Sequence, residues 1–335
     1  MRVTWAACAA PIVAFAVSLA LVGRLVWGAA SKVALDQPNA RSLHSQPVPR
    51  LGGAGIFAGT FAGWALLLLG LPGEPGLTAP VWVASALLAI VSLGEDVWGI
   101  PMRWRFLAHL VAALLFAWVA LVGAVPWWLL PPIVIGTVWA TNLYNFMDGS
   151  DGLAGGMAAV GFCAYAVAAW CAHQAAFGLM TLCVVGAAGA FLCFNFAPAR
   201  IFMGDVGSIP LGFLAASFGV FGWSRGLWPA WFPLLVFSPF WVDATVTLVA
   251  RQLRGEKVWQ AHRSHYYQRL VLMGWGHRRV ALAEYVLMAA AAGSGLVMRH
   301  GPGWAQAALV VGWIVAYIVA MRAVDVRWKR FASRT

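Results

Sequence analysis

Apolar runs of about twenty residues recur along nearly the whole of this sequence, and they limit the fold more than any other feature. Of its 335 residues, 62% are hydrophobic and only 10% are charged. A helix needs about 20 apolar residues to cross the hydrocarbon core of a bilayer. The sequence therefore predicts an all-α polytopic membrane protein with about eleven transmembrane helices. The predicted spans are Trp5 to Trp27, Leu51 to Leu71, Thr78 to Gly94, Phe106 to Val125, Trp127 to Ala140, Leu153 to Trp170, Ala175 to Phe196, Ile209 to Trp223, Pro229 to Ala250, Ala281 to Met298 and Trp304 to Met321.

The cationic residues predict the orientation of these spans, because Lys and Arg near span ends stay on the cytoplasmic side of a membrane. If the connection 28–50 lies inside, the inner segments carry 18 Lys and Arg. The outer segments then carry three, which are Arg2, Arg225 and Arg299. We therefore expect the N-terminus outside and the C-terminus in the cytoplasm.

The outer connections are only a few residues long, so we expect a single integral membrane domain, 1–335, without a separate soluble domain. Polar chemistry must then be built from the inner segments, and we expect these to form the active site. They are residues 28–50, 95–105, 142–152, 197–208 and 251–280.

The net charge of +11 would suggest nucleic-acid binding in a soluble protein. Here the orientation and an anionic inner leaflet account for most of it, so no nucleic acid is expected. The five cysteines include no CxxC pair and are interpreted as small core residues. Gly55, Gly59 and Gly63 lie four residues apart on the second span and predict a close helix contact, within the monomer or across a homodimer.

Five carboxylates recur at the predicted inner ends of spans, where a charged group is costly unless it binds something. Glu95 and Asp96 follow the third span, Asp148 and Asp151 precede the sixth, and Asp205 precedes the eighth. Helix capping would account fully for Asp205 and partly for Asp151, because a carboxylate suits a helix N-terminus. It does not account for Glu95 and Asp96, which lie at a helix C-terminus. This pair is therefore the stronger evidence for a ligand.

Several carboxylates with amide partners suit a hard divalent cation, because such ions prefer oxygen ligands. The amide partners are Asn142, Asn145 and Asn195. We therefore expect Mg²⁺, with Mn²⁺ as the alternative. The spacing of Asp148 and Asp151 does not continue into a calcium-binding loop with its terminal Glu.

The first inner segment offers the opposite charge. Arg41, His44 and Arg50 precede a pair of glycines, where backbone amides can approach an anion. Residues 251–279 add seven Lys or Arg and three histidines, although orientation alone explains a cationic loop equally well.

His262 and His265 are more specific than the charge of their loop. In a helix they would share a face, where they could bind phosphate or contribute to a zinc site, and no cysteine or third nearby histidine supports zinc. Acids that hold Mg²⁺ beside cations that hold phosphate, all at the inner membrane surface, predict a site for a diphosphate substrate and a lipid acceptor.

These residues fall in motifs that resemble a known family. HSQPVPRLGG, GED, NLYNFMDGSDGLAGG, NFAPARIFMGDVGS and AHRSHYYQRL follow one another between Arg41 and about Arg269. Together they resemble the polyprenyl-phosphate N-acetylhexosamine-1-phosphate transferases of glycosyltransferase family 4. Such enzymes move a sugar phosphate from a UDP-sugar onto undecaprenyl phosphate and release UMP. The resemblance implies a Mg²⁺-dependent, multi-pass enzyme of the bacterial inner membrane whose active site faces the cytoplasm.

Carried over position by position, the resemblance makes Asp205 the principal Mg²⁺ ligand. Asp96 corresponds to an acid of the paired-aspartate motif, with three roles open: metal ligand, proton acceptor or nucleophile. Asp148 and Asp151 correspond to acids around the nucleotide and the metal. Phe202 corresponds to an aromatic residue that packs on uracil.

The same resemblance leaves two departures from the family pattern. The first paired aspartate is here Glu95, which could bind metal, orient Asp96 or do neither. His262 and His265 belong to the histidine motif of the last large inner loop, which reads HRSH. Enzymes that transfer phospho-N-acetylmuramoyl-pentapeptide typically have three consecutive histidines there. The sequence is therefore closer to the branch that starts O-antigen or related envelope glycans from UDP-N-acetylglucosamine or a 6-deoxy analogue.

Three other functions have weaker support in the sequence. A transporter would place its ionisable groups at mid-span, where only Asp243 and Glu284 lie. A phosphotransferase that uses a CDP-alcohol needs a different continuation after Asp151 and Gly152. An inactive scaffold homologue is the third alternative, because Glu95 replaces the first paired aspartate.

Overall fold

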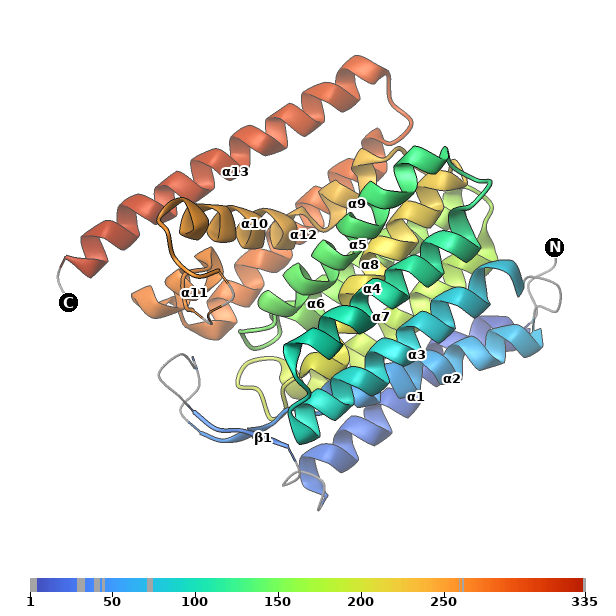
Figure 1. The fold of residues 1–335 in the computed structure, drawn as a ribbon, viewed down its shortest axis with the longest axis horizontal. Coiled ribbons are helices and arrows are strands. Elements are labelled where there is room, and N and C mark those ends of the chain that lie inside the picture. The colour runs from blue at the N-terminus through green and yellow to red at the C-terminus, as the bar shows by residue number, and fades with distance from the viewer. Residues whose placement is uncertain are drawn as a thin grey trace.

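A computed structural model describes residues 5–28, 34–38, 43, 46–70, 75–258, 260 and 262–333, and it is helical almost throughout (Figure 1). The helices are α1 (Trp5–Trp27), α2 (Gly52–Gly70), α3 (Pro75–Trp98), α4 (Met102–Phe116), α5 (Leu130–Phe146), α6 (Leu153–Cys171), α7 (Ala175–Asn195), α8 (Asp205–Ser224), α9 (Trp231–Val236), α10 (Ser238–Leu253), α11 (Tyr266–Leu270), α12 (Gly276–Met298) and α13 (Gly303–Ala332). The first inner connection adds two short antiparallel strands, β1 (Leu35–Asp36) and β2 (Val48–Pro49).

The expected fold class is confirmed, because nine helical segments among the described residues are long and apolar enough to cross a membrane. Two predicted spans correspond to helices that are not among these nine segments. The span predicted from Trp127 to Ala140 lies over α5, which has 17 residues. The span predicted from Pro229 to Ala250 divides into α9 and α10 at Phe237. Pro239 stands at the start of α10, where a residue without an N–H group begins a helix rather than continues one.

The glycine ridge of α2 packs against α1 inside the monomer. A Cβ atom added to Gly59 would lie 2.4 Å from the carbonyl oxygen of Ala14, and one added to Gly55 would lie 2.5 Å from Val22. Only glycine allows the two backbones to approach this closely. The ridge therefore has an intramolecular partner, and the homodimer stays a prediction without support from it.

Helices α6, α7 and α8 form the most enclosed part of the bundle, and α13 crosses outside it with little of its surface covered (Figure 1). Large apolar side chains such as Trp118, Ile135 and Val319 stay exposed on outer helices. In a bilayer this apolar surface faces lipid.

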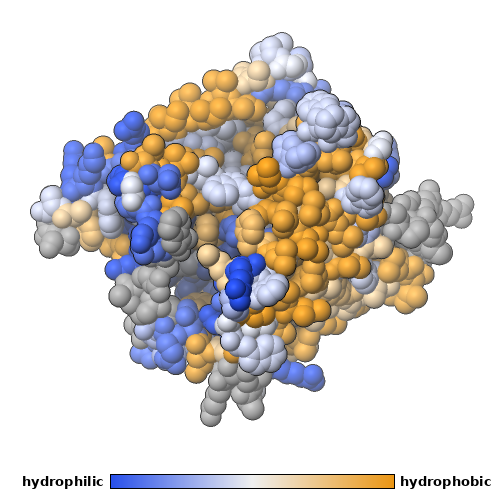
Figure 2. All heavy atoms as spheres, viewed as in Figure 1, coloured by the Kyte–Doolittle hydropathy of each residue, from blue (hydrophilic) through white to orange (hydrophobic). Residues whose placement is uncertain are grey.

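The inner segments predicted to form the active site meet at one end of the bundle, the end with α11 and β1 in Figure 1. Figure 2 shows hydrophilic side chains gathered at this end and hydrophobic residues over the helices beside it. Helix α1 begins at the opposite end from that at which α13 ends, as an odd number of crossings requires (Figure 1).

Candidate active site

Asp96, in the last turn of α3, holds the beginning of α8. Its carboxylate accepts hydrogen bonds from the backbone N–H groups of Val206 (2.9 Å) and Asp205 (3.3 Å). These are free amides of a helix N-terminus, where negative charge is favourable. Arg50 adds a bond from Nη2 to the carbonyl oxygen of Asp96 and an ion pair of 3.7 Å to its carboxylate. The prediction that capping does not account for Asp96 is wrong, because Asp96 caps a helix distant in sequence.

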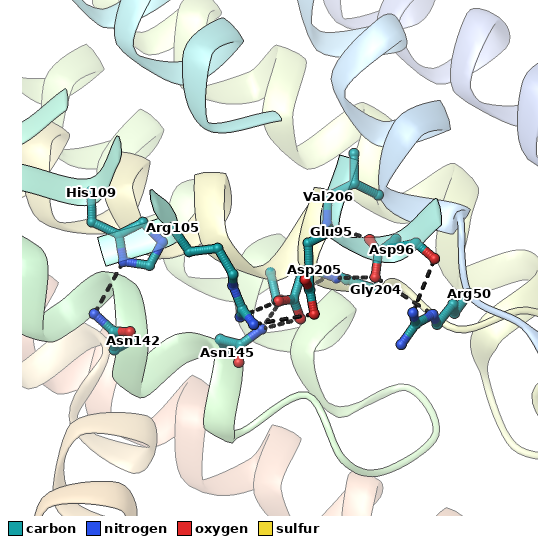
Figure 3. A network of polar contacts seen from close by, with 11 residues as sticks. Arg50, Glu95, Asp96, Arg105, His109, Asn142, Asn145, Gly204, Asp205 and Val206 are labelled. Carbon is teal, nitrogen blue, oxygen red and sulfur yellow. Dashed lines mark hydrogen bonds and ion pairs between the residues drawn. The ribbon is translucent and has the colours of Figure 1, made fainter. Parts of the chain in front are cut away.

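Asp205 does not cap α8 with its side chain, although helix capping would have accounted for it fully. It is the first residue of α8, but its carboxylate points away from the helix amides and forms an ion pair with Arg105 of α4. Asn145 donates a second hydrogen bond to it, at 2.8 Å. Arg105 also pairs with Glu95 at 3.2 Å, so one guanidinium joins two carboxylates from different helices (Figure 3).

Gly204 allows the segments of this network to approach each other. Its φ angle is +72°, a conformation that favours glycine. An added Cβ atom would lie 2.1 Å from the carbonyl oxygen of Arg50 and 2.8 Å from the carboxylate of Asp96. Glycine is therefore required where the first, second and fourth inner segments meet.

Asp148 is the one acid of the predicted set that has no counter-charge among the described residues. It forms no ion pair there, and its side chain accepts no hydrogen bond from them. Burial, together with the charges of Asp205 and Asp96, raises the pKa of Asp148 well above its usual range. A divalent cation would relieve this repulsion.

The residues present suit such a cation chemically, although they do not enclose it. Asp96, Asp148 and Asp205 influence one another electrostatically and offer only oxygen ligands. Within the described ranges, no three His, Cys, Asp or Glu side chains converge into a ready metal cage. Arg105 pairs with the Oδ2 atom of Asp205, one of the oxygens that could bind a cation.

Asp151 and Asn195 fasten two inner loops to each other. Asp151 accepts a hydrogen bond from the backbone of Ala199 at 2.9 Å. Asn195 is buried, and its amide bonds to the N–H group of Gly152 and to the carbonyl oxygen of Ile201, both at 2.9 Å. Both ends of the Asn195 amide are thus used inside the protein, which favours a structural role over the predicted substrate contact.

The two histidines of the HRSH motif lie together, but not on a helix. His262 lies in a loop, and His265 is the N-cap residue of α11. The helix in which they would share a face does not form here, but their ring centroids are only 4.8 Å apart. Burial, with His265 and Arg251 nearby, lowers the pKa of His262 to about 4. At neutral pH His262 can donate or accept a hydrogen bond but carries no charge.

Two other predicted residues, Asn142 and Phe202, lie at or near this end. Asn142 bonds to the carbonyl oxygen of Val138 and to the ring of His109, at 2.7 and 3.3 Å, outside the carboxylate network. Phe202 is partly exposed, and its backbone bonds to Pro49 and Gly52. The predictions for Arg41 and His44 fall outside the described residues.

Two residues of the site are not predicted from the sequence. Arg105 is one of the inner cations that predict the orientation. Nothing in a single sequence indicates that it reaches Asp205, one hundred residues away. His277 was counted only as one of three loop histidines. Its ring is 2.9 Å from the hydroxyl of Ser150, 3.7 Å from the carboxylate of Asp151 and 3.3 Å from the carbonyl oxygen of Leu43, so it joins three inner segments.

An apolar groove of about 260 Å³ lies between α5, α8, α9 and α10. Gly136, Ala216, Pro233 and Trp241 are among the residues that line it. The groove reaches Ala140, little more than one helical turn from Asn145. Its shape and lining suit a hydrocarbon chain.

Comparisons with known proteins identify the family. The model of glycosyl transferase family 4 matches residues 78–222, which include Glu95, Asp96, Arg105, Asp148 and Asp205. A probable undecaprenyl-phosphate N-acetylglucosaminyl 1-phosphate transferase of Bacillus subtilis is 30% identical over 311 residues, which cover 88% of this chain and 86% of the relative. The chain belongs to glycosyl transferase family 4.

Other relatives in family 4 differ in their named substrates. The decaprenyl-phosphate N-acetylglucosaminephosphotransferase of Mycolicibacterium smegmatis is 30% identical, over 86% of this chain and 80% of its own length. A phospho-N-acetylmuramoyl-pentapeptide-transferase of Desulforudis audaxviator is also 30% identical, over 86% of this chain and 94% of its own length. Family 4 membership thus leaves the donor sugar to be argued from the site.

Proposed function

We propose that this protein transfers an N-acetylhexosamine 1-phosphate group from a UDP-sugar to undecaprenyl phosphate and releases UMP, which initiates an O-antigen or related envelope polysaccharide. The observation that carries the proposal is the network of Arg50, Asp96, Arg105, Glu95 and Asp205, in which charged groups from the first, second and fourth inner segments converge at one end of the bundle (Figure 3). The names of the relatives support the same reaction class.

In the proposed reaction, an oxygen of the lipid phosphate forms a bond to the β-phosphorus of the UDP-sugar. The bond from this phosphorus to the bridging oxygen breaks, and UMP leaves with the electron pair. A phosphate monoester has a second pKa of about 6, so the acceptor is mostly dianionic at neutral pH and needs no strong base. What the protein must supply is positioning and compensation of negative charge.

Different residues would provide positioning and compensation of negative charge. Arg50 and Arg105 place two guanidinium groups where diphosphate oxygens can bind. Asp205, Asp96 and Asp148 would hold Mg²⁺, which supplies further positive charge beside the transferred phosphoryl group. Asp96 also fixes the start of α8 and thereby the position of Asp205.

The apolar groove supports a lipid acceptor. On α5 it reaches Ala140, five residues before Asn145, and on α8 it begins at Ala215, ten residues after Asp205. An apolar groove between helices can hold part of a prenyl chain. This arrangement favours a lipid substrate over a transported solute, for which the charges would lie at mid-span.

The HRSH motif supports N-acetylglucosamine or a 6-deoxy-N-acetylhexosamine as the sugar rather than phospho-N-acetylmuramoyl-pentapeptide. His262 is held neutral, and Arg263 beside it is exposed. The loop therefore presents two imidazoles separated by a guanidinium and a hydroxyl, where three successive imidazoles would stand. The side chains of this loop that could contact the sugar therefore differ from those of the pentapeptide transferases.

UMP release tests the proposal. Purified protein in detergent would be given undecaprenyl phosphate, Mg²⁺ and, in separate reactions, UDP-N-acetylglucosamine, a UDP-linked 6-deoxy-N-acetylhexosamine and UDP-N-acetylmuramoyl-pentapeptide. We expect release with one of the first two donors, none with EDTA, and none with Asp205→Asn. Asp325→Asn, which changes a carboxylate on α13, serves as the matched control and should stay active. No release with any donor from folded wild-type protein would leave the inactive scaffold as the better reading.

A further inference from the structure

Asp243 lies in the middle of α10, in a stretch that the sequence predicts to be membrane-embedded, and it is only 6% exposed. A buried carboxylate needs several hydrogen bonds to compensate for lost hydration. For Asp243 the sequence predicts either an arginine partner or a side chain that faces the interior of the helix bundle. The structure shows neither an arginine nor a lysine in contact with it among the described residues.

Its partners come instead from the segment that follows the HRSH motif. The backbone N–H groups of Tyr266 and Tyr267 each donate to the Asp243 carboxylate at 3.0 Å. The Nδ1 atom of His265 lies 3.2 Å from the same carboxylate. Thr247, one turn further along α10, adds a hydroxyl at 3.1 Å. The first three bonds tie α10 to the histidine motif.

The bond to Nδ1 fixes the state of the His265 ring. An ionised carboxylate only accepts hydrogen bonds, so Nδ1 must carry the proton. The atom left for a ligand is then Nε2, with which no described residue forms a hydrogen bond. Stacking on Phe146 and Tyr267, at centroid distances of 6.4 and 5.8 Å, holds the plane of the ring.

The same segment touches the turn that carries Asp148. The hydroxyl of Tyr267 donates to the carbonyl oxygen of Phe146 at 3.1 Å, and a Cβ atom on Gly149 would lie 2.2 Å from that hydroxyl. Tyr267 is also the residue whose N–H group Asp243 holds. Asp243 thus supports both His265 and one wall of the charged network.

We propose that Asp243 is a positioning residue for the transfer reaction: it holds His265 with Nδ1 protonated, so that Nε2 is the atom offered to a substrate phosphate. This inference rests on the proposed function. Groups that orient a ligand-binding histidine from behind commonly change its performance by about 10- to 100-fold. Asp243 acts through His265 and touches no reactant.

A double-mutant cycle on UMP release tests the coupling. We expect Asp243→Asn and His265→Gln each to lower kcat/KM by about 10- to 100-fold. If Asp243 acts through His265, the double variant loses no more than His265→Gln alone. Losses that multiply would overturn the proposal, because they would mean that Asp243 supports activity independently of the imidazole.

Asp325→Asn is the matched control, because it makes the same chemical change on a carboxylate that also holds α11. Asp325 pairs with Arg269 at 2.8 Å and accepts a bond from the hydroxyl of Tyr266, but it does not touch His265. We expect its activity to stay within about threefold of wild type. A loss equal to that of Asp243→Asn would show that anything loosening α11 impairs the enzyme, and would overturn the specific role of Asp243.

A second variant keeps the test decisive if Asp243→Asn fails to fold. In His265→Asn, the side-chain amide can replace Nδ1–H as donor to Asp243 but supplies no atom at the Nε2 position. We expect wild-type thermal stability and an activity as low as that of His265→Ala. Full activity in His265→Asn would overturn the proposal. Wild-type protein measured beside these variants separates the two inferences. An inactive wild type would refute the transferase and with it the role of Asp243, whereas an active wild type with an equally active Asp243→Asn would refute the role of Asp243 alone.

Discussion

Asp96 and Asp205 show how neighbouring carboxylates receive different tasks from their surroundings. Asp96 is almost fully buried, and its oxygens are used by two backbone N–H groups and by Arg50. Asp205 keeps more exposure and is held by side chains, which can move aside more readily than a backbone. Of the two, Asp205 is therefore better placed to exchange its partner for a ligand.

Arg105 offers the first prediction at this scale. Arg105→Ala leaves Glu95 and Asp205 without their shared counter-charge. Hydrogen bonds to charged groups contribute about 1.5–3 kcal/mol each, so kcat/KM should fall by about 10- to 100-fold. Arg105→Lys keeps the charge but cannot pair with two carboxylates in the same way. Its kcat/KM should therefore lie between those of Arg105→Ala and wild type. Steady-state UMP release measures all three proteins.

Arg103→Ala is the control for this prediction. Arg103 lies on the same helix, but its side chain is exposed and contacts only the ring of Trp104 among the described residues. Its removal changes the net charge by the same amount. Equal losses in the two alanine variants would show that the general charge of the segment matters and that the Arg105 pairs do not.

At the scale of elements, the groove between α5, α8, α9 and α10 depends on small residues. A Cβ atom added to Gly136 meets nothing within 4 Å, so a larger side chain there projects into the groove without a backbone clash. Gly136→Leu should therefore raise the KM for undecaprenyl phosphate by about tenfold, since losing fit in an apolar pocket costs about 1–3 kcal/mol. The KM for the UDP-sugar should stay unchanged.

Gly312→Leu is the matched change outside the groove. Gly312 lies on α13, and its added Cβ atom likewise meets nothing within 4 Å. This variant should keep both KM values. If Gly136→Leu also kept them, the lipid would not use this groove.

The glycine ridge of α2 gives a prediction about stability. In Gly59→Ala the new methyl group would lie 2.4 Å from the carbonyl oxygen of Ala14, and two helix backbones cannot shift as cheaply as a side chain. Overpacking of this kind costs about 1–3 kcal/mol. The melting temperature in detergent should therefore fall.

Gly189→Ala calibrates this measurement. Gly189 lies inside α7 and has open space at its Cβ position. Alanine there should leave the melting temperature unchanged or raise it, because Gly in a helix interior costs about 0.5–1 kcal/mol relative to Ala. A Gly59→Ala protein as stable as Gly189→Ala would mean that α1 and α2 separate easily.

For the whole molecule, hydropathy predicted the membrane class because about twenty apolar residues per span is a requirement of the bilayer itself. It failed at α9 and α10, where the residues between Pro229 and Ala250 are apolar enough for one span but the backbone breaks at Phe237. The depth of the acids was predictable because charge is expelled toward water. Which acid meets which cation was not, because Arg105 reaches Asp205 only through the packing of α4 against neighbouring helices.

The orientation of the molecule stays a prediction, and it decides whether the site can reach a cytoplasmic UDP-sugar. The charged network lies at the end of the bundle toward which α13 runs (Figure 1). The cationic residues assign that end to the cytoplasm. A single exposed cysteine at each end distinguishes the two orientations, using Arg225→Cys between α8 and α9 and Arg330→Cys near the end of α13.

In intact cells, a membrane-impermeant maleimide should label Arg225→Cys and leave Arg330→Cys unlabelled. After permeabilisation both should be labelled. The native cysteines lie in helices long enough to cross a membrane, and four of the five are exposed there, so the unsubstituted protein is labelled in parallel to measure the background. Labelling of Arg330→Cys in intact cells would reverse the orientation and place the network outside, away from nucleotide donors. The chemistry proposed for the site would then have no substrate, however well its residues were arranged.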